Sequence, residues 1–317
     1  MRTDLSRVRW DAGALNNGLI FGATCYGVAR LPPACSYAIG HVGTWLAYRL
    51  IRRGTDAIIG NLRVVCPEAD ERQLRHLALS TYRSYARDTI DFIRTLDMDH
   101  AAIARMVVRE QGSRLDDLLA RGKGVLLVGG HFGNWEFGGI ALRVITGHRI
   151  TVVGKPEPSP TVGDLRRRMR DAFGIETVEV GQMLDTALRL RGLLAAGGVV
   201  AMLADRYLAR DAIDVTFFGR QTRFLRSPAM VAQLSDAPLL PAFVLRQRDG
   251  RYLARFGDPI LPGSAEPGES SVRSMTQQFA TQLEMQIREH PEFWYQFYPY
   301  WGADAPTPPL RGERFQV

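Results

Sequence analysis

Short apolar runs alternate with helical patterns between residues 125 and 204, and this alternation limits the possible folds more than any other feature. Strand-like runs occur at 125–128, 150–154, 175–180 and 198–204, and helical patterns separate them at 135–146, 162–173 and 184–196. Further strand signals follow at 213–218, 239–245 and 251–256, with helices at 227–236 and 272–289. Such spacing is typical of βαβ units. It predicts an α/β fold with a mainly parallel central sheet flanked by helices.

The first 110 residues are predicted to be helical. Between Thr55 and Thr95, apolar residues recur mostly at three- and four-residue spacing. We therefore expect residues 1–110 to form a helical, membrane-facing part. Residues 111–317 would form the α/β core, with both parts packed as one domain.

Residues 12–48 are the most apolar long segment. Arg30 is their only formally charged side chain, but Asn16-Asn17 and Pro32-Pro33 also interrupt them. A membrane-spanning helix needs roughly 20 largely apolar residues. The pattern favours two helices that pack on the body or lie in the membrane interface over a transmembrane anchor.

Composition and charge narrow the functional classes. The chain has 317 residues, of which 46% are hydrophobic and 23% charged, so disorder is excluded as its main state. A net charge of +7 suits an acidic partner, such as an anionic membrane surface, a phosphorylated lipid or a carrier protein, although a solvated basic surface would look the same. Aromatic residues do not interleave with the basic clusters in any nucleic-acid-binding motif, so we expect no nucleic-acid partner.

The cysteines and histidines indicate no metal centre. Cys25, Cys35 and Cys66 lie far apart, which favours reduced thiols in a cytosolic protein over disulfides or metal ligands. No histidines share a metal-ligand spacing such as His-Glu-x-x-His, and the N-terminus lacks a convincing signal peptide. We predict no metal.

One stretch combines a base and a carboxylate. The apolar run Val125–Val128 ends in two glycines, and His131 and Glu136 follow before the next helical pattern. Histidine can take a proton from a hydroxyl near neutral pH, and a carboxylate on its other nitrogen fixes the tautomer. No serine or cysteine nucleophile stands in the motif, which favours direct attack by the hydroxyl of a substrate.

These residues resemble a known family. The segment Gly130-His131-Phe132-Gly133-Asn134-Trp135-Glu136 resembles the His-x4-Asp/Glu signature of the lysophospholipid acyltransferase superfamily. Its flanks resemble the bacterial branch that contains lipid A lauroyl acyltransferases and phosphatidylinositol mannoside acyltransferases. The likeness extends over roughly residues 20–300 and includes Asn61-Leu62, Lys155-Pro156-Glu157, Leu165-Arg166-Arg167, Phe173-Gly174-Ile175, Ala204-Asp205-Arg206, Val215-Thr216-Phe217-Phe218-Gly219 and Glu289-His290-Pro291-Glu292 with Trp294.

The resemblance implies an O-acyltransferase with a glycerol-phosphate acyltransferase-like fold. It would move a fatty acyl group from a thioester on acyl carrier protein or coenzyme A to a lipid or glycolipid hydroxyl, with no cofactor, at the cytoplasmic face of the inner membrane. His131 would be the general base and Glu136 would orient it, while amides around Gly133 and Asn134 would stabilise the oxyanion. The residues expected to bind acceptor or donor are Lys155, Asp205, Arg206, Phe218, Gly219 and Arg223. A second basic cluster, at Arg166, Arg167, Arg168 and Arg170, would dock an acidic carrier protein or form a solvated helix face.

Two departures from the lipid A pattern bear on the acceptor. No arginine stands in Val178-Glu179-Val180-Gly181, and Asp205 is followed by Arg206-Tyr207-Leu208. Both favour a phosphatidylinositol mannoside type or another lipid acceptor. The open alternatives are a thioesterase, in which water replaces the acceptor, and a catalytically inactive lipid- or carrier-binding protein.

Overall fold

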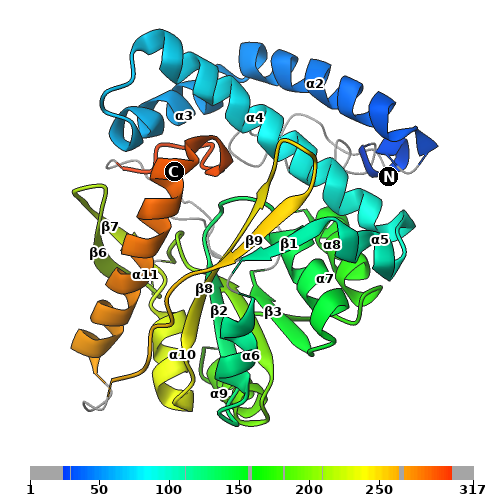
Figure 1. Cartoon of the computed structure of the whole chain (residues 1–317). Helices are drawn as coiled ribbons and strands as arrows, with labels where there is room; N and C mark the ends of the chain where they lie inside the picture. Colours follow the sequence, from blue (N-terminus) through cyan, green and yellow to red (C-terminus); the bar gives the residue numbers. More distant parts are fainter. Residues whose placement is uncertain are drawn as a thin grey trace, which may run out of the picture.

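The chain folds into a helical layer on an α/β body (Figure 1). The computed structural model describes residues 24–301, except 29, 111, 156–158, 181–182, 209 and 264–267. The longer helices are α2 (Pro33–Leu50), α3 (Arg52–Val65), α4 (Glu71–Arg94), α5 (His100–Arg105), α6 (Ser113–Leu119), α7 (Trp135–Thr146), α8 (Pro160–Asp171), α9 (Met183–Ala195), α10 (Ser227–Ser235) and α11 (Glu269–Glu289). The strands are β1 (Val107–Glu110), β2 (Val125–Gly129), β3 (Ile150–Gly154), β4 (Glu176–Glu179), β5 (Val199–Leu203), β6 (Ile213–Phe217), β7 (Arg220–Phe224), β8 (Leu239–Arg246) and β9 (Tyr252–Phe256).

The predicted parallel sheet is confirmed. The described residues form a seven-stranded sheet in the order β1-β9-β8-β2-β5-β3-β4. Strand β2 lies parallel to β5 and β8, and β3 lies parallel to β5 and β4. The strand direction changes at one edge of the sheet: β9 runs antiparallel to β8, and β1 runs parallel to β9. Strands β6 and β7 form a separate antiparallel hairpin.

Two strands were missing from the sequence prediction. Both β1 and β7 are short, and charged residues occupy much of each, so neither carries an apolar pattern. Strand β1 also lies within residues 1–110, the range predicted to be the helical part, although it pairs with β9 of the sheet.

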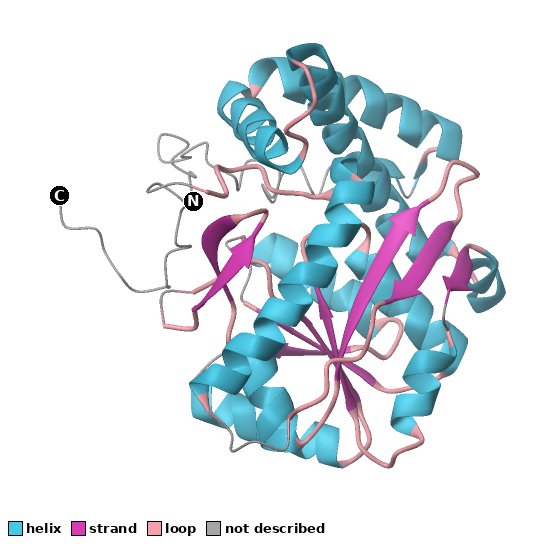
Figure 2. Ribbon diagram, turned by 60° about the vertical axis from the view of Figure 1, so that its left-hand side comes forward, coloured by secondary structure: helices cyan, strands magenta, loops and turns pink. Residues whose placement is uncertain are grey.

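Helices α2, α3 and α4 lie together across one end of the body, as Figure 1 and Figure 2 show. Helix α4 begins with a capping box, in which Asp70 and Gln73 each accept from the other's backbone amide. Asn61 of α3 donates to the carbonyls of Gln296 and Tyr298, which fastens this layer to the C-terminal segment. The earlier of the two helices predicted within residues 12–48 falls largely outside the described residues. Among those described, no helix is both long and apolar enough to cross a membrane.

Helix α2 has an inverted polarity. Its inward side carries small and polar residues beside the tyrosines Tyr37 and Tyr48: Ser36 and Thr44 are buried, and a Cβ on Gly40 would come within 2.8 Å of Ile90. Its large apolar side chains face outward, with Ile39 at 60% and Leu50 at 75% exposure. Because a helix normally buries its apolar stripe, this arrangement leaves an apolar surface on the outside of the molecule.

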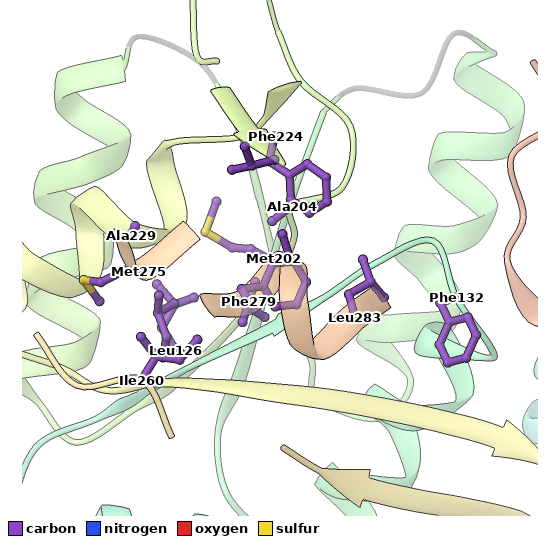
Figure 3. Packing of buried hydrophobic residues seen from close by; sticks show 14 of the residues in the cluster. Leu126, Phe132, Met202, Ala204, Phe224, Ala229, Ile260, Met275, Phe279 and Leu283 are labelled. Atoms are coloured by element: carbon purple, nitrogen blue, oxygen red, sulfur yellow. The ribbon is translucent and has the colours of Figure 1, made fainter. Parts of the chain in front are cut away.

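The two faces of the sheet are packed differently. On one face, residues such as Leu126 and Val200 are fully buried beneath α9, α10 and α11, and Figure 3 shows this packing. On the face beneath α7, side chains from the middle of the sheet remain partly accessible: Val152, Ala201, Ala242, Val244 and Ala254. This partial accessibility shows that space remains over these residues, although α7 comes close to β8 at Gly138, where a Cβ would lie 2.6 Å from Val244 Cγ2.

Candidate active site

His131 and Asp205 come together because the strands that precede them are neighbours. Strand β2 pairs in parallel with β5, and Gly129 lies opposite Leu203 in the register. Both residues therefore leave the sheet at the same edge, where the carboxyl ends of parallel strands carry ligands and catalytic groups. The prediction that Asp205 shares a sheet edge with His131 is confirmed.

The two side chains form a close pair. His131 Nδ1 lies 2.7 Å from Asp205 Oδ1, and the backbone amide of His131 donates to Asp205 Oδ2 at 2.9 Å. Asp205 is fully buried, whereas the His131 side chain keeps 19% of its surface exposed and lines a cavity. With Nδ1 held by the carboxylate, Nε2 is the ring nitrogen left to accept a proton from a substrate.

The ionisation of the pair fits a neutral base. Burial lowers the pKa of His131, and the charge of Arg206 lowers it further, against the opposing effect of Asp205. Burial alone would raise the pKa of Asp205, but the contacts with His131 and the charge of Arg206 hold it below its ordinary value. Asp205 is therefore ionised and His131 neutral at pH 7, so that Nδ1–H donates to the carboxylate.

The C-terminal segment fixes Asp205. Gln296 Nε2 donates to Asp205 Oδ2 at 2.7 Å, and Tyr300 Oη donates to the Asp205 carbonyl at 2.6 Å. Gln296 is held in turn by Arg206, whose Nε donates to Gln296 Oε1 at 3.0 Å. These hydrogen bonds hold both the carboxylate and the backbone carbonyl of Asp205, so the carboxylate keeps one orientation.

Glu136 does not occupy the orienting position that the sequence analysis gave it. Glu136 lies on the side of α7 that faces α8, where Arg170 donates to both of its oxygens, at 3.0 and 2.6 Å, and Arg166 lies 3.9 Å away. Burial would raise the pKa of Glu136, but these two guanidinium groups lower it below its ordinary value. The residue that orients His131 in the structure is Asp205, and Glu136 instead holds two arginines of the second basic cluster in the cavity wall.

The amides expected to form an oxyanion hole are already used. The Gly133 amide donates to the Phe293 carbonyl at 2.9 Å, and the Asn134 amide donates to the Val244 carbonyl at 2.8 Å. Both point into the protein because the turn after His131 packs against β8 and the C-terminal segment, where Gly133 adopts a φ of 67°. The prediction that these two amides bind the oxyanion is therefore wrong for this conformation.

A large cavity opens beside His131. Its volume is about 1830 Å³, above the roughly 300–1,000 Å³ of ordinary small-molecule pockets. It runs beneath α7, where its wall includes the partly accessible residues of the sheet together with Gly138, Gly139 and Leu142 of the helix. The wall is mainly apolar, and its cationic residues include Arg53, Lys155, Arg166, Arg170, Arg206 and Arg210.

The remaining predicted site residues divide into two groups. Lys155 and Arg206 line the cavity. Phe218 and Gly219 instead make the tight turn of the β6–β7 hairpin, with φ of 53° and 70°, and Phe218 packs against Trp294. Arg223 lies over the ring of Tyr207, which does line the cavity.

Several residues at the site were missed by the sequence analysis. Gln296 lies in the C-terminal aromatic segment, where Tyr295 and Tyr300 are buried. Arg170 was treated only as part of a basic cluster. The available signal was the four-residue spacing of Arg166 and Arg170, which places both on one side of α8.

Comparisons with known proteins show which families the chain is similar to. A family model described as bacterial lipid A biosynthesis acyltransferase matches residues 18–302. The phosphatidylinositol mannoside acyltransferase of Mycobacterium tuberculosis (strain CDC 1551 / Oshkosh) is 30% identical over 234 residues, which cover 72% of this chain and 71% of the relative. The protein of that name from Mycolicibacterium smegmatis is 27% identical over 286 residues, 87% of this chain and 88% of the relative. The lipid A biosynthesis lauroyltransferase of Escherichia coli K12 is 26% identical over 233 residues, 71% and 72% of the two chains.

Proposed function

Because the chain belongs to the bacterial lipid A biosynthesis acyltransferase family, we propose that it transfers a fatty acyl group from an acyl thioester to a hydroxyl of a glycolipid. The donor would be acyl carrier protein or coenzyme A. The acceptor class follows from the names of the relatives, phosphatidylinositol mannoside acyltransferase and lipid A biosynthesis lauroyltransferase. The observation that carries the proposal is the neutral His131, oriented by a buried carboxylate at the edge of an apolar cavity.

The chemistry needs a base but no protein nucleophile. His131 Nε2 would take the proton of the acceptor hydroxyl as the oxygen attacks the thioester carbonyl carbon. The tetrahedral intermediate collapses with cleavage of the carbon–sulfur bond. The imidazolium then returns its proton to the leaving thiolate, so that the products are an ester and a free thiol. Asp205 would stabilise the imidazolium between these steps.

Cationic side chains supply the electrostatic support that the turn amides do not. Arg206 and Arg166 lie close enough to His131 for their charges to lower its pKa. The same positive charge, in a wall that excludes much water, would stabilise negative charge on the carbonyl oxygen of the intermediate. The apolar part of the cavity beneath α7 would hold the acyl chain.

We further propose that the protein works at the cytoplasmic face of the cell membrane, and the outward side of α2 supports contact with a membrane. Ile39, Val42 and Leu50 are exposed apolar residues, and exposed Arg52 and Arg53 follow immediately. An apolar stripe beside cations fits an interfacial helix on an anionic lipid surface. Arg53 also lines the cavity, so this surface adjoins the cavity wall.

The activity is tested by mass spectrometry of glycolipids incubated with an acyl thioester and the protein. The expected product is a glycolipid heavier by one acyl group, and His131→Ala should lower its rate by about 10³-fold, as for other catalytic bases. Release of free fatty acid without acylated lipid would identify a thioesterase. Transfer by His131→Ala at the wild-type rate would reject the base.

The membrane setting is tested by flotation with vesicles that contain anionic lipid. Ile39→Ser with Val42→Ser removes apolar area from α2 and should reduce the bound fraction several-fold, by the scaling of roughly 25 cal/mol per Å². Leu261→Ser is a matched control, because Leu261 is 52% exposed and lies outside α2. Equal binding by both variants would contradict the assignment to α2.

A further inference from the structure

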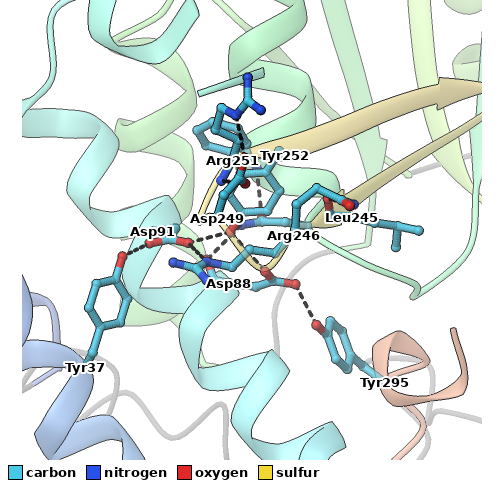
Figure 4. Close-up of polar contacts among 12 residues, drawn as sticks. Tyr37, Asp88, Asp91, Leu245, Arg246, Asp249, Arg251, Tyr252 and Tyr295 are labelled. Carbon is cyan, nitrogen blue, oxygen red and sulfur yellow. Dashed lines mark hydrogen bonds and ion pairs between the residues drawn. The ribbon is translucent and has the colours of Figure 1, made fainter. Parts of the chain in front are cut away.

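A buried polar cluster beneath α4 touches both sides of the turn that carries His131. Asp88 of α4 accepts a hydrogen bond from Tyr295 Oη at 2.5 Å, and the Tyr295 amide donates to the His131 carbonyl at 2.8 Å. On the other side, Asn134 Nδ2 donates to the Asp88 backbone carbonyl at 3.0 Å. Asp88 of the helical layer thus contacts both Tyr295, which holds the His131 carbonyl, and Asn134, which follows His131 in the chain. Figure 4 shows Asp88 with Tyr295 and the rest of the cluster.

The hydrogen-bond donors in this cluster can be counted. Tyr252 Oη carries one proton, yet it lies 2.6 Å from Asp91 Oδ2 and 3.0 Å from Asp88 Oδ1. It also lies 3.0 Å from Asn134 Nδ2. That nitrogen is the donor end of the amide, because Asn134 Oδ1 accepts from the Phe137 amide at 3.1 Å. Tyr252 can therefore donate to only one of the two carboxyl groups.

Asp91 is the carboxyl group that holds the negative charge. Arg246 Nε donates to Asp91 Oδ2 at 2.8 Å, and the Tyr37 hydroxyl donates to Asp91 Oδ1. An ionised acceptor attracts the Tyr252 proton more strongly than a neutral one. With that proton directed to Asp91, the contact between Asp88 Oδ1 and Tyr252 Oη is favourable only if Asp88 supplies the hydrogen.

We propose that Asp88 is a positioning residue that works as a neutral carboxylic acid, donating to Tyr252 and accepting from Tyr295 to hold the His131 turn in its catalytic geometry. Asp88 does not reach the substrate. Its effect passes through Tyr295 and Asn134. This inference concerns the site of the proposed function and rests on it.

The surroundings of Asp88 favour the protonated form. The titratable and charged groups around it come from four elements: Asp91 of α4, Arg246 of β8, Tyr252 of β9 and Tyr295 of the C-terminal segment, with Tyr37 of α2 beyond Asp91. Burial raises the pKa of Asp88 to about 7, and the charge of Asp91 also raises it, against the hydrogen bonds with Tyr295 and Tyr252 and the charge of Arg246, which lower it. Above that pH, Asp88 would ionise beside Asp91, lose its bond to Tyr252 and repel its neighbour.

Two substitutions separate positioning from simple packing. Asn is close to isosteric with a neutral Asp and can donate to Tyr252 while accepting from Tyr295, so Asp88→Asn should keep kcat within a few-fold near pH 6 and abolish the decline of kcat above about pH 7. Asp88→Ala should lower kcat by about 100-fold, the usual cost of a catalytic group displaced by about 1 Å, with little change in KM. If Asp88→Ala does not fold, Tyr295→Phe keeps the ring, breaks the same link and should lower kcat in the same way.

The proton itself can be observed without any turnover. Infrared spectra of the wild type near pH 6 should contain the band of a buried protonated carboxyl group, and that band should vanish in Asp88→Asn. Absence of the band, or an Asp88→Asn variant as damaged as Asp88→Ala, or an unchanged alkaline limb in Asp88→Asn, would overturn the proposal. If the band is present but the wild type transfers no acyl group, the proposed function fails while the protonation of Asp88 stands.

Discussion

The two faces of the central sheet are both apolar but differ in the size of their side chains and in how they are covered. Leu126 and Leu127 are neighbours in β2, yet Leu126 packs into the tight cluster with α10 and α11, whereas Leu127 forms part of the cavity wall. The face that contains Leu127 includes alanines at central positions, Ala201 and Ala242, and Gly139 in the helix above them has open space around it. Small residues on both sides of the layer leave the space that large residues fill on the opposite face. One face therefore supplies stability and the other supplies volume.

Truncating these two adjacent leucines should have unequal effects on stability. Leu126→Ala leaves a void in a packed core and should lower the free energy of unfolding by about 3 kcal/mol. Leu127→Ala enlarges a cavity that already exists, so its cost should be closer to the transfer term alone, about 1.5 kcal/mol. Urea titrations of both variants measure the difference. Equal losses would mean that the cavity face is as tightly packed as its opposite.

The rate of acyl transfer should be insensitive to the substitution that costs most stability. Each folded molecule of Leu126→Ala should transfer acyl groups at close to the wild-type rate, because Leu126 is absent from the cavity wall. This readout is the internal control for the stability measurements. A large loss of turnover in folded Leu126→Ala would remove the distinction between the faces.

A smaller effect, on the preference for acyl-chain length, is expected from a substitution that narrows the cavity without removing packed atoms. Gly139 lies in α7 on the cavity wall, and a Cβ there would have no neighbour within 4 Å. Gly139→Leu should improve helix propensity by about 0.8 kcal/mol while filling part of the cavity. The preference for long over short acyl donors should fall roughly tenfold, since a methylene group in an apolar pocket contributes 10-fold or more.

Gly192→Leu is the matched control for that experiment. Gly192 is an exposed helical glycine of α9, it also has open space around it, and it lies outside the cavity wall. It gains the same propensity without narrowing the cavity, so its acyl-chain profile, measured with donors of graded length, should match the wild type. Identical shifts in Gly139→Leu and Gly192→Leu would show that the chain does not lie beneath α7.

The sequence predicts the fold well where local pattern and tertiary pairing agree. The apolar runs at β2, β3 and β5 and the helices between them follow from periodicity, because buried parallel strands are apolar throughout. Strands β1 and β7 do not follow from periodicity, because they are short and polar and form only through pairing with β9 and β6. The inverted polarity of α2 is equally hidden, because a sequence shows a stripe of apolar residues without showing which side it faces.

Only part of the candidate site could be predicted from the sequence in the same way. His131 could be identified because a glycine-rich turn follows a buried strand. Its partner in the structure, Asp205, was placed at the correct edge but given a role in substrate binding, because Glu136 stands in the same short motif as His131 and was assigned the orienting role. Only the register of β2 against β5 and the arginines of α8 decide between them. Gln296 comes from a segment 91 positions further along the chain than Asp205, a contact that no local pattern encodes.

The cavity beneath α7 has a consequence for stability as well as for binding. An acyl chain lying there would complete a hydrophobic core that the polypeptide leaves unfinished, so the loaded protein would resist unfolding more than the empty one. By the same linkage, any change that stabilises the folded state around this cavity would tighten binding of the acyl donor. The protein without its donor would therefore lack part of its hydrophobic core.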